Sequence, residues 1–581
     1  MSDTERKENG NRPAPAGQDH KRSGGMKGSG AGRGPARPSG TGRTARSGGK
    51  PFGRGKTFGG KAKESPRRGE PGKTRTPGKT AEGARQGDAH GRPAGAGQRA
   101  GFHSRPADAG QRAGFHGRPA GAPYGRPAPK KAPEMEGLAA RRTALKVLRA
   151  VTEEGAYASL VLDKVLQGSG MSGADRRLVS RLVYDTLDNL QYLDHMLGQV
   201  MAREDTDIKL RNILRLGACQ ILLEDRIPES AATNTCVQLC TECGMEGLKG
   251  VCNGILRNLV RKKDELTLPD PAEEPDRYFA VKYSLPEWLG RRLRQDWGEE
   301  TAREMAAWRN TDSAVTIRRN LLKTDGEGFR RILEKKIWGK EEGDLPGAWR
   351  IRGAMDLARD ADYLGGQFSI QSESSMMACL AVGVRRGMQV LDCCAAPGGK
   401  TCYLSELMGD TGRVQAWDLH EHRVQLIASQ QKRLGLENIR PRVLDAAKYR
   451  EEMESTMDAV LLDAPCSGLG VLAEKPDIKL RVTEESVAEL TALQARLLDT
   501  VCRYVKPGGV LVYSTCSLLK DENERQISAF LERHPEYSAE ALPESIPARF
   551  RAREQLGLQL IPHRDGVEGF YICRMRRKDE M

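Results

Sequence analysis

Two cysteines stand at the ends of two apolar segments in the last third of the chain. Cys466 closes "AVLLDAPCSG", and Cys516 follows in "GVLVYSTCSLL". Each apolar run has the length and the branched side chains of a buried strand. A cysteine thiolate is a strong nucleophile, so two thiols delivered to one cleft could carry out covalent catalysis. Either thiol alone would be as readily explained as part of the core.

Acidic residues follow the other predicted strands of this region. The runs "MQVLDCC", "GRVQAWDLH", "RPRVLDAAKY" and "MDAVLLDAPC" reach Asp392, Asp418, Asp445 and Asp463. A Gly-rich turn, "CCAAPGGK", follows the first run, and a helix is predicted to start near Lys400. An acid after the second strand can accept hydrogen bonds from the ribose of a nucleoside lying over such a turn. The turn lacks the dinucleotide spacing and suits adenosine with a compact polar tail, as in S-adenosylmethionine.

Strands that alternate with helices predict an α/β domain with a parallel, doubly wound sheet. Ligands of such sheets bind beyond the carboxyl ends of the strands, where the strand order switches. The fifth strand, "VLVYSTCS", is expected after a helix from Glu484 to Val505 and a "YVKPGG" turn. The fourth and fifth strands are adjacent in doubly wound methyltransferases. Cys466 and Cys516 are therefore expected to face the same cleft.

A pair of thiols is suited to the methylation of carbon 5 of cytosine. Carbon 5 of cytosine is a poor nucleophile until a thiolate adds at carbon 6, and a second thiol can assist release of the product. A base stacked in a helix is out of reach, so the nucleic acid must present it unstacked or flipped. Cytosine methylation is thus one chemistry that suits these residues.

Four motifs carry a resemblance to a known family. "CCAAPGGK", "DAPCSG" with "KPDIK" after it, "YSTCSLLKDENE" and "DGVEGFYICRM" resemble the RNA cytosine-5 methyltransferases of the Sun family, which implies a Rossmann-like domain that uses S-adenosylmethionine and no metal. The resemblance implies that Cys516 is the nucleophile, that Cys466 assists release, and that Asp463 can also hydrogen-bond the base. The cofactor-binding residues that it implies are Cys394, Ala395, Ala396, Pro397, Gly398, Gly399, Lys400, Asp418, Asp445 and Asp463.

The spacing of the two cysteines does not by itself decide which one attacks. DNA cytosine methyltransferases use the cysteine after proline, which corresponds to Cys466, so the choice of Cys516 rests on the resemblance. Methyltransferases that act on amino groups place an aromatic residue in the motif after the fourth strand. "DAPCSG" has none, which disfavours that class.

Amphipathic helical patterns fill the region from 137 to 263. "ILRLGACQILLEDRIPESAATNTCVQL" and "LKGVCNGILRNLVRK" resemble the all-helical NusB-type RNA-binding domain. Together with the motifs, this domain points to the ribosomal small-subunit methyltransferase B branch. A connecting subdomain from 264 to 372 and a methyltransferase domain from 373 to 577 complete the prediction. The implied substrate is a cytosine of 16S rRNA, free or in an early small-subunit particle.

Two alternatives stay open. One is an enzyme that acts on another rRNA or tRNA cytosine, because the family shares these motifs. The other is a non-catalytic RNA-binding or assembly factor that keeps a relic of the fold. Intact "PCS" and "TCS" signals count against the second.

Three further cysteines, Cys236, Cys240 and Cys243, lie close together in the helical region. A zinc site needs about four ligands, usually in two separated pairs. Cys252 could be a fourth, but no histidine is near in sequence. We therefore expect structural or surface thiols and no metal.

The first 135 residues differ in composition from the rest of the chain. They hold 29 Lys and Arg against 10 Asp and Glu, a net charge of +19. The remainder holds 64 against 68, a net charge of −4, so the excess of positive charge in the whole chain, +15, comes from this tail. Few aliphatic residues and two copies of an Arg- and Phe-containing repeat predict a disordered tail that contacts RNA, or a solubilising extension without a specific partner. With no long apolar stretch, the chain is predicted to be cytoplasmic and free of membrane spans.

Overall fold

The computed structural model of the chain describes residues 135–203, 205–309, 314–353, 355–553 and 555–579. The disorder predicted for residues 1–135 falls outside this set, apart from Met135. None of the helices in these described ranges combines the length and the apolar character that crossing a bilayer requires.

Helices alone make up the first described domain, as predicted. They are α1 (Leu138–Glu154), α2 (Ala158–Leu166), α3 (Gly173–Asp188), α4 (Leu190–Gly198), α5 (Ile208–Leu222), α6 (Glu229–Glu242) and α7 (Lys249–Lys262). α5 is buried along nearly its whole length and packs against α1, α3, α4, α6 and α7. Gly217 on α5 allows the Leu256 side chain to approach the helix backbone, since a Cβ there would lie 2.8 Å from it.

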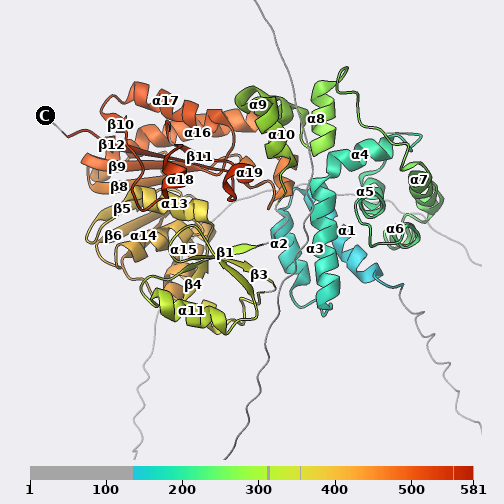
Figure 1. The fold of residues 1–581 in the computed structure, drawn as a ribbon, viewed down its shortest axis with the longest axis horizontal. Helices are drawn as coiled ribbons and strands as arrows, with labels where there is room; N and C mark the ends of the chain where they lie inside the picture. Colours follow the sequence, from blue (N-terminus) through green and yellow to red (C-terminus); the bar gives the residue numbers. More distant parts are fainter. Residues whose placement is uncertain (1–134, 204, 310–313, 354, 554, 580–581) are drawn as a thin grey trace, which may run out of the picture. The chain divides into compact units, whose positions relative to one another are not determined.

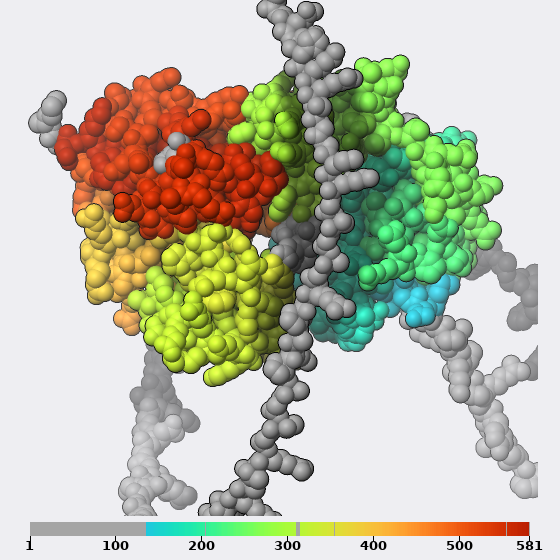
Figure 2. Space-filling model, in the orientation of Figure 1, coloured from blue at the N-terminus to red at the C-terminus, as the bar shows by residue number. Residues whose placement is uncertain are grey.

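The connecting region contains helices and a small sheet. Its elements are α8 (Pro275–Tyr283), α9 (Glu287–Trp297), α10 (Glu299–Ala307), β1 (Val315–Arg319), α11 (Gly326–Glu334), β2 (Gly339–Glu342), β3 (Ala348–Arg352), α12 (Ala361–Leu364) and β4 (Phe368–Ile370). The four strands form an antiparallel sheet in the order β2-β3-β1-β4. Figure 2 shows the residues around this small sheet in yellow-green next to the red carboxyl-terminal part, in line with the ion pair between Arg549 and Asp344.

The carboxyl-terminal region is built on a larger sheet. Its strands are β5 (Gln389–Asp392), β6 (Arg413–Asp418), β7 (Ile439–Val443), β8 (Met457–Asp463), β9 (Val505–Thr515), β10 (Tyr537–Ala539), β11 (Leu558–Leu560) and β12 (Phe570–Arg577). Their order is β10-β12-β9-β8-β5-β6-β7, with β11 beside β12. β7, β6, β5, β8 and β9 run parallel, and β12 is antiparallel to β9. The strand order switches between β5 and β8, so the doubly wound prediction is confirmed.

Helices cover both faces of the large sheet (Figure 1). They are α13 (Glu373–Val382), α14 (Gly399–Leu407), α15 (Glu421–Leu434), α16 (Glu484–Val501), α17 (Glu524–Arg533) and α18 (Ala548–Arg551). The short α19 (Pro562–Asp565) packs against α10 instead. Successive strand residues point to opposite faces. Val390 and Leu461 therefore join the core beneath α13, α14 and α15, whereas Leu391 and Val460 join the core beneath α16 and α17.

Two boundaries differ from the sequence prediction. β9 begins at Val505, whereas we predicted a helix up to this residue and a turn after it; α16 ends at Val501. The early start arises because Val505 pairs with Met457, and a register shift after that pair accommodates the Pro-Gly-Gly sequence within the strand. β7 ends at Val443, so Asp445 lies two residues beyond the strand instead of at its end.

Candidate active site

The two cysteines meet at the carboxyl ends of β8 and β9. These strands are parallel neighbours, with Asp463 opposite Ser514, so the residues that follow them leave the same edge of the sheet. The Sγ atoms of Cys466 and Cys516 lie 3.2 Å apart. The part of the prediction that brings the two thiols together is therefore confirmed.

A buried carboxylate, Glu522, holds the two cysteine loops together. It accepts hydrogen bonds from the backbone N–H of Ser467 at 2.8 Å and from the hydroxyls of Ser467 and Ser517. Gln494 on α16 donates to Glu522 at 3.1 Å and to the Pro465 carbonyl at 2.9 Å. The sequence analysis missed Glu522; the only signal for it is the acidic run "KDENE" after Cys516.

Charges near the thiols distinguish Cys516 from Cys466. The hydrogen bond from Cys466 lowers the pKa of Cys516 below its ordinary value, against the effect of burial, and the positive charges of Lys400 and Lys475 act in the same direction. The same hydrogen bond raises the pKa of Cys466 well above its ordinary value. The backbone N–H of Cys516 donates to Cys466 Sγ at 3.3 Å, which favours charge on Cys466. The hydrogen bond from Cys466 and the two positive charges of Lys400 and Lys475 lower the pKa of Cys516 despite the charge of Asp463, which raises it, and we therefore assign the thiolate to Cys516.

Lys400 and Asp463, both predicted cofactor residues, form an ion pair beside the thiols. Lys400 Nζ donates to Asp463 Oδ2 at 2.8 Å, and Ser514 Oγ donates to Asp463 Oδ1 at 2.8 Å. Burial by itself would lower the pKa of Lys400, but the charge of Asp463 raises it above its ordinary value. Lys400 also lies 5.3 Å from the centre of the Phe570 ring. The ammonium group of Lys400 is therefore held in place by Asp463.

The predicted Gly-rich turn joins β5 to α14 and lies beside β6. The backbone N–H of Ala395 donates to the Trp417 carbonyl at 2.8 Å. Gly398 has φ 102°, and a Cβ on it would lie 3.1 Å from the Ile427 backbone, whereas a Cβ on Gly399 would meet no atom within 4 Å. The start of α14 therefore has open space beside Gly399, as a ligand that approaches a helix N-terminus requires.

The remaining predicted acids lie along the same edge of the sheet. Asp418, at the end of β6, is 3% exposed, and its Oδ2 lies 3.4 Å from Arg423, which also donates to the Ala396 carbonyl. Asp445 accepts from the backbone N–H of Ala447 at 3.0 Å and so holds its own loop. A ribose with two hydroxyl groups fits acceptors of this kind at the end of β6 and in the loop after β7.

Asp392 and Cys394 differ from these acids because burial raises the pKa of both groups. Asp392 accepts from the Thr401 hydroxyl at 2.7 Å, and burial raises its pKa to about 7. Its Oδ1 has no hydrogen-bond partner within the described residues. Burial also raises the pKa of the Cys394 thiol, so Cys394 is not activated as Cys516 is. The residues of the turn fit S-adenosylmethionine, since a nucleoside and a charged amino-acid tail need open backbone donors and carboxylates.

The cysteines of the helical domain have no metal-site geometry. Within the described ranges, no group of three or more His, Cys, Asp or Glu side chains is arranged to hold a metal ion. Cys236, Cys240 and Cys252 are buried in the domain core. A hydrogen bond from Cys252 lowers the pKa of Cys240, and Cys243 is half-buried.

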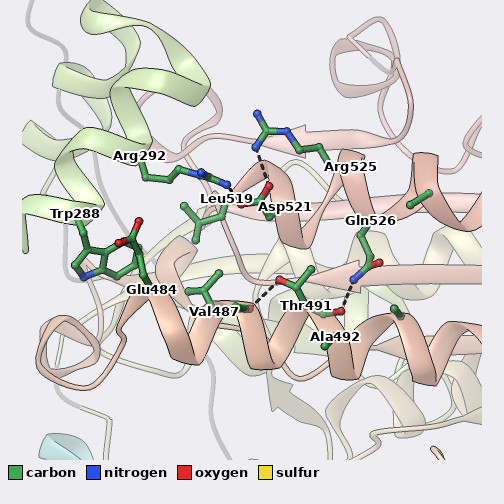
Figure 3. A pocket seen from close by; sticks show the side chains of 13 residues that line it. Trp288, Arg292, Glu484, Val487, Thr491, Ala492, Leu519, Asp521, Arg525 and Gln526 are labelled. Atoms are coloured by element: carbon green, nitrogen blue, oxygen red, sulfur yellow. Dashed lines mark hydrogen bonds and ion pairs between the residues drawn. The ribbon is translucent and has the colours of Figure 1, made fainter.

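A separate groove of about 610 Å³ lies between α9, α16 and α17 (Figure 3). Small residues of α16, among them Ala492, form its floor, and Trp288 stands at one end. Its arginines are paired with carboxylates; Arg525, for example, lies 2.9 Å from Asp521. None of the predicted site residues lines this groove, so it is not the site of the thiol chemistry.

Comparisons with known proteins agree with the geometry of the site. The model of a family described as "16S rRNA methyltransferase RsmB/F" matches residues 380–576, the NusB family matches residues 138–261, and a ferredoxin-like domain of RsmF/B-like methyltransferases matches residues 285–358. The ferredoxin-like unit corresponds to part of the connecting region, which the sequence analysis did not recognise as a domain of known type.

Curated relatives span nearly the whole of the region described. The chain is 35% identical over 450 residues, 76% of its length, to the whole of the "Probable ribosomal RNA small subunit methyltransferase B" of Bacillus subtilis. It is 32% identical, over 75% of its length, to 98% of the "Ribosomal RNA small subunit methyltransferase B" of Klebsiella pneumoniae. A solved structure titled "Crystal Structure of PH0851" matches with a TM-score of 0.65 and 26% identity, over 76% of this chain and 99% of that one. The chain therefore belongs to the RsmB/F family of methyltransferases, which use S-adenosylmethionine to methylate small-subunit ribosomal RNA.

Proposed function

We propose that this enzyme methylates carbon 5 of a cytosine in 16S rRNA through a covalent adduct with Cys516. The observation that carries the proposal is the thiol pair, with 3.2 Å between the two Sγ atoms. Transfer to an amino group or to a ribose hydroxyl requires no cysteine, whereas activation of carbon 5 requires a nucleophile at carbon 6. The lowered pKa of Cys516 supports its assignment as that nucleophile.

Cys516 adds to carbon 6 of the cytosine, and carbon 5 gains carbanion character. Bound S-adenosylmethionine supplies an electrophilic methyl group to that carbon. Asp463, held by Lys400 and Ser514, faces the same cleft and is suited to hydrogen-bond the amino edge of the base. Transfer of the carbon 5 proton to a base from solvent then re-forms the double bond between carbons 5 and 6 and expels Cys516 as a thiolate. Cys466 assists this release because its thiol donates a hydrogen bond to the departing sulfur.

The residues proposed to hold S-adenosylmethionine are those of the turn and the nearby acids. Asp418 and Asp445 accept hydrogen bonds from the ribose hydroxyls and from neighbouring groups of the nucleoside. The backbone of the turn contacts the amino-acid tail of the cofactor. Lys400 and Asp463 line the side of the cofactor site that is nearest to the thiols. The whole set is Cys394, Ala395, Ala396, Pro397, Gly398, Gly399, Lys400, Asp418, Asp445 and Asp463.

The domain roles that we propose follow the sequence prediction. The helical domain, 137–263, contacts the RNA, the subdomain from 264 to 372 connects it to the catalytic part, and residues 373–577 carry out the transfer. The match of the NusB family to residues 138–261 supports the first of these roles.

Covalent trapping tests the proposal. Purified enzyme is incubated with labelled S-adenosylmethionine and unmodified 16S rRNA, and protein–RNA adducts are sought on denaturing gels for wild type, Cys516→Ala and Cys466→Ala. We expect no methylation by Cys516→Ala and an accumulated adduct with Cys466→Ala. An adduct that forms with Cys516→Ala but not with Cys466→Ala would exchange the two roles. Methylation that survives both substitutions would refute the covalent mechanism.

A further inference from the structure

Three segments of the chain meet at one carboxylate, Asp188, the last residue of α3. Lys479, in the loop that follows Cys466, donates to Asp188 Oδ1 at 2.6 Å and to the Asp188 carbonyl at 2.7 Å. Arg309, just beyond α10, lies 2.6 Å from Asp188 Oδ2. The helical domain, the connecting region and the catalytic loop are therefore joined by one ionic cluster.

Lys479 is unusual because its ammonium group is buried. Its side chain is 5% exposed, and burial lowers the pKa of Lys479 while the charge of Asp188 raises it. A buried charge is tolerated only when it is paired and hydrogen-bonded. Such a pair fixes the relative position of the two segments that it joins more strictly than an apolar contact of the same area does. The lysine thus holds its loop in one position on α3.

A second attachment lies two residues to either side of Lys479. Asp477, 3% exposed, accepts from Arg481 at 2.5 Å and from the backbone N–H of Ala158 at 3.4 Å. Arg481 donates to the Ala156 carbonyl at 3.2 Å and lies 4.1 Å from the centre of the Tyr157 ring. Both side chains therefore bind the start of α2 in the helical domain.

The other end of the same loop is fixed to the thiol pair. Ser467 is held by Glu522, and the backbone N–H of Gly470 donates to the Cys516 carbonyl at 2.9 Å. Leu469 is buried in the apolar cluster that α8, α9 and α10 supply. Lys475, between the two ends, is one of the charges that lower the pKa of Cys516. Residues 466–481 are thus a segment that is attached at one end to the thiol pair and at the other end to the helical domain.

We propose that Lys479 is a positioning residue, which through Asp188 sets the place of Cys466 and Lys475 relative to Cys516. The helical domain is then a structural part of the catalytic centre as well as a contact for RNA. The inference rests on the proposed function only in taking the two thiols as the reacting pair. Its test is therefore a property of the thiols themselves, measured without RNA or cofactor.

The first measurement is the rate at which iodoacetamide alkylates Cys516, followed by peptide mass spectrometry across a range of pH. Lys479→Met keeps the length of the side chain and leaves Asp188 paired with Arg309. We expect the midpoint of the alkylation profile to rise by about half a pH unit or more, because Cys466 and Lys475 no longer stabilise the thiolate fully. Leu480→Ala is the matched control, since Leu480 belongs to the same turn and is 39% exposed.

The second measurement is methyl transfer to 16S rRNA. Lys479→Met is expected to lower kcat about tenfold or more while the Kd for S-adenosylmethionine stays within about twofold, because the turn after β5 is untouched. Arg481→Met, with a side chain 27% exposed in wild type, provides a milder variant should Lys479→Met fail to fold. An alkylation midpoint that is unchanged in the folded variants would overturn the proposal. If wild type makes no 5-methylcytidine, the alkylation profile still decides the positioning role.

Discussion

Gly470 lies where three backbone segments of the active site touch, and its replacement by alanine is expected to be severe. A Cβ at this position would lie 1.9 Å from the Gly569 carbonyl oxygen and 2.9 Å from the Cys516 carbonyl oxygen, whereas ordinary contacts begin at 3.4 Å. Both neighbours are backbone atoms, so neither can rotate away. The loop that carries Cys466 must therefore move by more than about 1 Å in Gly470→Ala.

This movement breaks the two hydrogen bonds that Gly470 makes with Cys516 and Gly569, each 2.9 Å long. Their loss costs about 1 kcal/mol each, and overpacking adds about 1–3 kcal/mol. We expect the free energy of unfolding of the catalytic domain to fall by about 3–5 kcal/mol, and its Tm by about 10 °C. A displacement of about 1 Å between reacting groups lowers kcat by about 100-fold.

The assays are thermal unfolding and single-turnover methyl transfer at a temperature where the variant is folded. Gly250→Ala is the control, because Gly250 lies in α7 and a Cβ there would meet no atom within 4 Å. That control should be neutral or gain up to about 1 kcal/mol. If Gly470→Ala kept kcat within about threefold of wild type and an unchanged Tm, the close contact of the loops would be refuted.

Three further predictions concern single groups. Cys466→Ala should raise the pKa of Cys516 and slow its alkylation at neutral pH, since the first cause of the lowered pKa is removed; an unchanged profile would contradict this. In wild type, Asp392 keeps a proton in the folded state between about pH 4 and 7, whereas the unfolded state releases it, so its contribution to stability should fall as pH rises through this range. Asp392→Asn should lessen the fall seen in urea unfolding without abolishing it, because burial also raises the pKa of Asp185 to about 7, and a fall as steep as that of wild type would contradict the prediction. Arg318→Met should cost about 3–5 kcal/mol in the same assay, because it leaves Glu406 buried and unpaired; a loss below about 1 kcal/mol would speak against the ion pair.

The sheet and the meeting of the thiols could be predicted because they depend on local patterns. Apolar runs of strand length that end in Asp418, Asp463 or Cys516 mark the carboxyl edge of a parallel sheet. The neighbouring positions of β8 and β9 then bring Cys466 and Cys516 together. Fold class and thiol geometry follow from the sequence to this extent.

Contacts between distant segments could not be predicted in this way. The salt bridge from Lys479 to Asp188 joins residues 291 positions apart, and neither residue differs by pattern from an ordinary surface charge. Glu522 could pass for part of an exposed acidic run, yet it is fully buried. The early start of β9 escaped prediction because Pro-Gly-Gly usually signals a turn, and only its partner β8 makes it a strand.

The identity of the methylated atom tests the central claim most directly. Unmodified 16S rRNA is incubated with the full-length enzyme and labelled S-adenosylmethionine, digested to nucleosides, and analysed by mass spectrometry against reference compounds. The thiol pair predicts that the label is found in 5-methylcytidine. Label in N4-methylcytidine, in a 2′-O-methylated nucleoside or in a purine would contradict the proposed chemistry, because none of these products needs a nucleophile at carbon 6.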